Sequence, residues 1–131
     1  MNVDDLIIRL DPIDVQIIDG SLTREQRGPD DQPCLIITGG TTTPRHRLID
    51  GTTAAAAQTW RVLASSNGPA GARHLTDHVT RLLDGWRMNR ATMRVQLVSE
   101  PIEDRDDPTD YRWSATVEAT IPTSPVRSFT P

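Results

Sequence analysis

Residues 111–121 constrain the fold of this chain most, because apolar and polar side chains alternate there without interruption. The alternate positions hold Tyr111, Trp113, Ala115, Val117, Ala119 and Ile121, and every residue between them is polar or charged. A period of two predicts a β-strand with one buried face. The run TMRVQLVS, residues 92–99, predicts a second strand, whose apolar face would hold Met93, Val95 and Leu97. We expect the two strands to pair as an antiparallel hairpin.

An amphipathic helix is predicted for residues 69–85, before this hairpin. Its apolar stripe consists of Ala72, Leu75, Val79, Leu82, Leu83 and Trp86. Pro69 near the start and Gly85 near the end follow the usual asymmetry of helix termini. Because a hairpin alone is only marginally stable in water, we expect the helix to cover the apolar face of the hairpin.

The chain opens with another helical pattern. Its apolar face would hold Val3, Leu6, Ile7 and Leu10. Asn2 is the expected N-cap, and Pro12 is expected to end the helix. Beyond that helix, Ile13, Val15 and Ile17 alternate with polar residues up to an Asp-Gly turn at positions 19–20. This alternation predicts a short strand.

Two more strands are predicted in the middle of the chain. The apolar run PCLIIT, residues 33–38, fits a strand that is covered on both faces and closed by a turn at Gly39 and Gly40. Turn residues follow up to position 52, with a brief strand expected at 47–50. Residues 54–66 begin with four alanines, which favour helix, but β-branched and aromatic residues dominate their second half. We therefore predict a strand there.

Together these elements predict an α+β fold, with a twisted, mainly antiparallel sheet of about five strands and two helices packed on it. Residues 1–121 would form one domain, which suits a chain of 131 residues. The remaining residues, 122–131, include three prolines. We predict that they form a tail that is extended or disordered unless a partner orders it.

The charge, the cysteine content and the hydropathy argue against a nucleic-acid-binding protein, a disulfide-linked protein and a membrane protein. A net charge of −4 gives no reason to expect a basic face that binds nucleic acid. The single cysteine, Cys34, excludes an internal disulfide and is expected in the core. No apolar run approaches the roughly 20 residues of a membrane-spanning helix, so no membrane partner is expected.

An acidic stretch lies between the two strands of the predicted hairpin. Six of the eleven residues 100–110 are carboxylates, which could form a metal site, a pair of catalytic acids or a charged connection. The stretch lacks the glycine and the closing glutamate of a calcium loop, and Pro108 stands where such a loop would bend. We therefore predict a solvated connection between strands. The residues predicted to lie at an interface or a channel are Glu103, Asp104, Asp106, Asp107 and Asp110.

The other motifs that could bind a metal or support catalysis are incomplete. His74 and His78 are one helical turn apart, a spacing that zinc can use, but a third ligand and a general base are missing. Both histidines lie off the apolar stripe, so we expect them to be solvated. No G-x-S-x-G elbow is present for a serine nucleophile. We predict no catalytic residue, no bound metal and no cofactor, and hence a protein that is not an enzyme.

The order of features in the second half resembles a known family. The strand QTWRVLASS leads through a Gly/Pro break into ARHLTDHVTRLLDGWR, followed by VSEPIE, an acidic turn and YRWSATVEATI. This arrangement is similar to that of the tail terminator, or tail completion, proteins of long-tailed phages of the siphovirus type, particularly those that infect actinobacteria. The earlier IIDG and PCLIIT segments match the family's usual order as well. The run of four alanines and the longer Pro-rich C-terminus depart from it.

The resemblance implies a structural protein of the virion with an α+β fold. Members of this family form a homohexameric ring at the head-proximal end of the tail, after assembly in the host cytoplasm. The implied partners are further copies of the chain, the major tail tube protein and the head-side connector or stopper protein, with DNA only in passage through the channel. In such a ring, the acidic stretches of all subunits would gather into one acidic band that faces the channel or the tube.

Two alternatives to a terminator remain open from the sequence. The first is another head–tail connector or minor tail protein of similar size. The second, from a different class, is a small metal-dependent hydrolase that uses His74, His78 and the acidic stretch. The mass of the purified protein in solution, read beside an analysis of bound metal, separates these classes.

Overall fold

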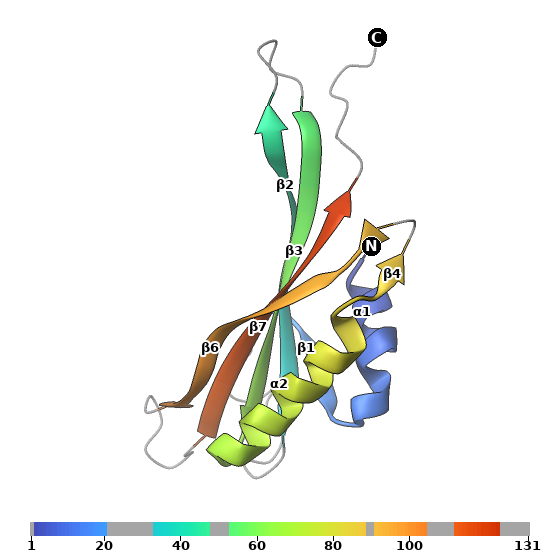
Figure 1. Cartoon of the computed structure of the whole chain (residues 1–131). Coiled ribbons are helices and arrows are strands. Elements are labelled where there is room, and N and C mark those ends of the chain that lie inside the picture. The colour runs from blue at the N-terminus through green and yellow to red at the C-terminus, as the bar shows by residue number, and fades with distance from the viewer. Residues whose placement is uncertain (1, 21–32, 48–52, 89–90, 105–111, 124–131) are drawn as a thin grey trace.

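The fold is known from a computed structural model, which describes residues 2–20, 33–47, 53–88, 91–104 and 112–123 (Figure 1). The helical elements are α1 (Val3–Leu10), the 3₁₀ turn η1 (Asp11–Ile13) and α2 (Pro69–Leu83). The strands are β1 (Gln16–Asp19), β2 (Cys34–Arg47), β3 (Thr53–Ser66), β4 (Arg87–Met88), β5 (Ala91–Thr92), β6 (Arg94–Asp104) and β7 (Arg112–Thr123).

Five strands form one twisted sheet in the order β1-β2-β3-β7-β6 (Figure 1). β1 and β2 are parallel, and the other three neighbouring pairs are antiparallel. β4 and β5 form a separate two-stranded ribbon. The predicted α+β fold with a mainly antiparallel sheet and two helices is therefore confirmed.

The core lies between the helices and one face of the sheet. α2 packs on β7, β6 and β3, and α1 packs beside α2. The residues that meet in this core include Leu6, Leu10, Leu35, Ile37, Val62, Leu75, Val79, Leu83, Val117 and Ala119. Along β7 the buried side chains alternate from Ala115 to Ile121, as the period of two requires. Cys34 is buried as expected.

The predicted hairpin is confirmed, and α2 covers it. β6 and β7 are antiparallel, with Val95 opposite Ala119 and Leu97 opposite Val117. Two side chains depart from the expected core: Leu97 is 50% exposed and Trp113 is half-buried. Both departures follow from position, because β6 is the outer strand of the sheet and Trp113 lies near the start of β7.

The prediction that Gly39 and Gly40 close a strand is wrong. Both glycines lie inside β2, which continues to Arg47. Beyond Arg47, the strand expected at 47–50 lies outside the described residues. The glycines form an irregularity in the register against β3 and have positive φ angles of 94° and 90°. A two-glycine bulge of this kind has the same local composition as a turn, which is why the sequence pattern suggested one.

Contacts from β3 explain why these two positions hold glycine. A Cβ on Gly39 would lie 2.8 Å from the carbonyl oxygen of Thr59, and a Cβ on Gly40 would lie 2.5 Å from the ring of Trp60. Gln58 adds a hydrogen bond, because its Nε2 donates to the carbonyl oxygen of Gly40 over 2.9 Å. The bulge thus lets the Trp60 indole lie directly over the backbone of β2.

The N-terminal helix forms as predicted. Asn2 accepts a hydrogen bond from the Asp5 amide over 3.1 Å, and Asp5 accepts one from the Asn2 amide over 3.0 Å. This reciprocal pair is a capping box. Beyond Leu10 the chain tightens into η1, and β1 begins only at Gln16. The expected start of that strand at Ile13 is therefore wrong, because Pro12 belongs to a 3₁₀ turn rather than directly preceding extended chain.

Candidate assembly surfaces

The structure places part of the predicted acidic connection in a strand. β6 extends through Glu100 to Asp104, with Glu103 opposite Trp113 and Asp104 opposite Arg112. The expectation of a loop that starts at position 100 is therefore wrong. Pro101 is tolerated because β6 is the outer strand of the sheet and because Pro101 lies in a register irregularity between Ser99 and Ile102.

Two of the five predicted interface or channel residues can be placed. Glu103 is half-buried near the end of β6, and Asp104 is the last residue of that strand. Asp106, Asp107 and Asp110 lie outside the described residues. The structure therefore puts the start of the acidic stretch at one end of the sheet edge.

β6 carries exposed apolar side chains on both faces of the sheet edge, which the sequence pattern did not indicate, with Leu97 opposite Val117 of the core face and Ile102 opposite Ser114 of the other face. Leu97, Val98 and Ile102 are 50%, 46% and 61% exposed. Of the four large apolar residues that are exposed in the described part of the chain, three are these. We call Leu97, Val98 and Ile102 the β6 patch. The only sequence signal for it is Pro101, since a proline inside a strand pattern indicates an edge strand.

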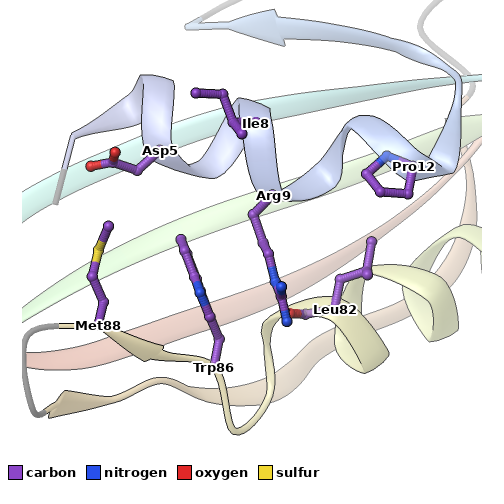
Figure 2. Close-up of a pocket in the computed structure, with 7 residues that line it drawn as sticks. All are labelled: Asp5, Ile8, Arg9, Pro12, Leu82, Trp86 and Met88. Carbon is purple, nitrogen blue, oxygen red and sulfur yellow. The ribbon is translucent and has the colours of Figure 1, made fainter.

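A second candidate surface is a hollow beside the N-terminal helix (Figure 2). It has a volume of about 430 Å³ and lies between α1, the end of α2 and β4. Its lining residues are Asp5, Ile8, Arg9, Pro12, Leu82, Trp86 and Met88. Ile8, which is 73% exposed, is the fourth exposed large apolar residue of the described chain. We call this site the α1 hollow.

Arg9 joins the two helices at the α1 hollow. Its Nε donates a hydrogen bond to the carbonyl oxygen of Leu82 over 2.8 Å. Its guanidinium carbon lies 5.4 Å from the centre of the Trp86 ring, within the range of a cation–π interaction. The bond satisfies a carbonyl in the last turn of α2, where a positive charge is also favoured by the helix dipole. Arg9 therefore stabilises the wall of the hollow and leaves it largely apolar.

The sheet face that the helices leave uncovered is more polar. Across this face Arg61 lies 3.6 Å from Glu118, and the hydroxyl oxygens of Thr59 and Thr120 are 3.3 Å apart. Such pairs suit a solvated sheet face. The β6 patch and the α1 hollow are therefore better candidates for contact with another protein than this face is.

His74 and His78, the histidines of the alternative metal-dependent hydrolase, lie on α2. Their ring centres are 5.7 Å apart, and His74 is exposed whereas His78 is half-buried. Within the described ranges, no group of three or more His, Cys, Asp or Glu side chains could hold a metal ion. Among the same residues, no helix is long and apolar enough to cross a membrane.

The chain matches no protein-family model and no curated protein.

Proposed function

We propose that this chain is a structural virion protein, a tail terminator that caps the tail tube of a long-tailed phage as a ring. The ring would join the tube to the head-side connector, and DNA would pass through its channel. The proposed partners are other copies of the chain, the major tail tube protein and the connector or stopper protein. The order of sequence elements from Trp60 to Ile121 supports this family over other structural proteins.

The observation that carries the proposal is that the sheet extends beyond its own helices. β2 and β3 are each 14 residues long. β3 pairs with β7 only from Ala56 onwards, so residues 53–55 have β2 as their neighbour in the described sheet. Figure 1 shows this end of β2 and β3 projecting past α1 and α2. A two-stranded ribbon is only marginally stable without cover, so a subunit of this shape suits an assembly in which a neighbour or the tube lies against the ribbon.

The character of the α1 hollow supports a structural role as well. Its walls are mainly apolar, and its two charged residues take part in local structure: Asp5 in the capping box and Arg9 in the contact between helices. Catalysis by acids and bases needs titratable groups that face each other across a substrate. An apolar hollow beside an exposed isoleucine is instead typical of a surface for another protein.

The function is tested by deleting the gene from the virus that encodes it and supplying the protein from a plasmid. Loss of a terminator leaves tails that are overlong or not joined to heads, and the plasmid-borne chain should restore joined tails of normal length. Electron micrographs of negatively stained particles give this result directly. Normal joined tails without the protein would refute the proposal, and absent or short tails would indicate a different tail component.

A further inference from the structure

The end of β7, from which residues 124–131 continue, lies close to the α1 hollow. Arg94 of β6 is opposite Thr120, so the residues just before β6 run alongside the last residues of β7. Those residues form β5, which contacts β7 and pairs with β4 through Ala91 and Met88. Met88 in turn lines the hollow (Figure 2). The β4–β5 ribbon therefore connects the end of β7 to the wall of the hollow.

We propose that residues 124–131, the C-terminal segment, dock into the α1 hollow of the same chain. Two strand spacings, about 10 Å, separate β7 from β4 across the ribbon. An extended chain rises about 3.3 Å per residue, so the six residues from Thr123 to Phe129 span about 20 Å. The C-terminal segment is therefore long enough to cross the ribbon and to lie along the hollow.

The apolar wall of the hollow suits an aromatic side chain. The C-terminal segment contains Phe129, which is the only phenylalanine of the chain. The hollow has a volume of about 430 Å³, and Ile8, Trp86 and Met88 line it. Trp86 and Met88 are half-buried, so each leaves apolar surface exposed there. A phenyl ring packs favourably on an indole and on a thioether, which makes Phe129 the anchor of the contact.

The charges around the hollow favour a positively charged segment. Arg127 is the only charged side chain among residues 124–131. On one side of the hollow, residues 3–13 hold three aspartates and one arginine. On the other side, residues 81–88 hold one aspartate and two arginines. A negative charge therefore remains when all of these groups are counted.

Asp5 is the partner that the geometry offers to Arg127. Asp5 lies at the same end of the hollow as Met88, whereas Arg9 lies farther along it (Figure 2). Asp5 uses Oδ2 in the capping box, so its Oδ1 can accept a charge-assisted hydrogen bond from Arg127. Arg127 and Phe129 are two residues apart and point to the same side of an extended chain, about 7 Å from each other. Arg127 can therefore reach Asp5 while Phe129 packs on the apolar wall.

The prolines of the C-terminal segment lower the cost of this docking. Pro125 and Pro131 fix their own φ angles near the value of extended chain, so less backbone freedom is lost on binding. The docked segment would also cover the exposed apolar surface of the hollow. An assembly partner that used the α1 hollow would have to displace the segment first. The contact itself does not rest on the proposed function.

A pair of cysteines tests the contact in the full chain. Met88→Cys together with Ser128→Cys places one thiol at the hollow and one beside Phe129, and a short bis-maleimide is added to the reduced protein. Cys34 is 2% exposed and should not react while the chain is folded, which circular dichroism verifies. His74→Cys together with Ser128→Cys is the matched control, because His74 is exposed on α2 and does not line the hollow.

Denaturing gels and mass spectrometry separate chains that are bridged within themselves from pairs of joined chains. The Met88 and Ser128 pair should be bridged within one chain, at a rate independent of protein concentration and at least about tenfold above that of the control. Adding Phe129→Ser should slow this reaction by about tenfold or more, because the phenyl ring supplies most of the apolar area that docking buries. Adding Thr130→Ser instead should leave the rate unchanged.

Three results would overturn the contact. Bridging no faster than in the control would show that the C-terminal segment does not lie at the hollow. Products that join two chains would place the segment on another copy. An unchanged rate after Phe129→Ser would show that the segment passes near the hollow without docking in it. The proposed function is judged separately, by the tails of the deleted virus.

Discussion

Replacing Gly40 by alanine tests the bulge that allows β2 to continue past the predicted turn. Gly40 has a φ of 90°, which costs an alanine about 1–2 kcal/mol. The new Cβ would also lie 2.5 Å from Cη2 and 2.7 Å from Cζ3 of Trp60. Displacing a buried indole is an overpacking change that costs about 1–3 kcal/mol. We expect Gly40→Ala to lower the free energy of unfolding by about 2–5 kcal/mol.

Gly85→Ala is the matched control for the backbone part of this cost. Gly85 has a similar φ of 82°, but nothing lies within 4 Å of the position that its Cβ would take. It should lose only about 1–2 kcal/mol, so the difference between the two variants measures the contact with Trp60. Both are measured by urea denaturation at one fixed protein concentration, because assembly shifts apparent stability. If Gly40→Ala costs no more than Gly85→Ala, the packing of Trp60 over Gly40 is refuted.

Two further predictions concern the tryptophans and the acidic stretch. Trp60→Ala should lower the free energy of unfolding by about 3–5 kcal/mol, because Trp60 is 6% exposed and belongs to the core. Trp113 is half-buried, so Trp113→Ala should lower it by only about 1–2 kcal/mol. Urea melts of the two variants check this order, and equal losses would contradict the burial of Trp60. Changing Asp104, Asp106 and Asp107 together to asparagine should alter the free energy of unfolding by less than about 0.5 kcal/mol but impair head–tail joining or DNA passage. Normal infectious particles at both low and physiological salt would show that the acidic stretch is only a solvated connection.

The parts of the fold that could be predicted are those in which local pattern and burial agree. The alternation in residues 111–121 and the stripe of α2 both arise because one face of each element meets the same core. These patterns were sufficient to predict the hairpin, its direction and its cover. Asn2 could be predicted as the N-cap because all of the atoms of the capping box lie within one helical turn.

The parts that could not be predicted depend on residues that are distant in the chain. Gly39 and Gly40 look like a turn until Trp60 is known to lie against them. Arg9 and Leu82 form the wall of the α1 hollow across a separation of 73 residues. Leu97 fits a buried strand face, and only the order of strands reveals that β6 is at the edge. The candidate surfaces were missed because exposure depends on the position of each strand in the sheet, which a local pattern does not contain.

The central claim is tested most directly by a cryo-electron microscopy reconstruction of the head-proximal end of the assembled tail. We predict one ring of six copies between the tail tube and the connector, with the twisted five-stranded sheet recognisable in each subunit. A single copy, threefold order or the absence of this chain at that level would contradict the account.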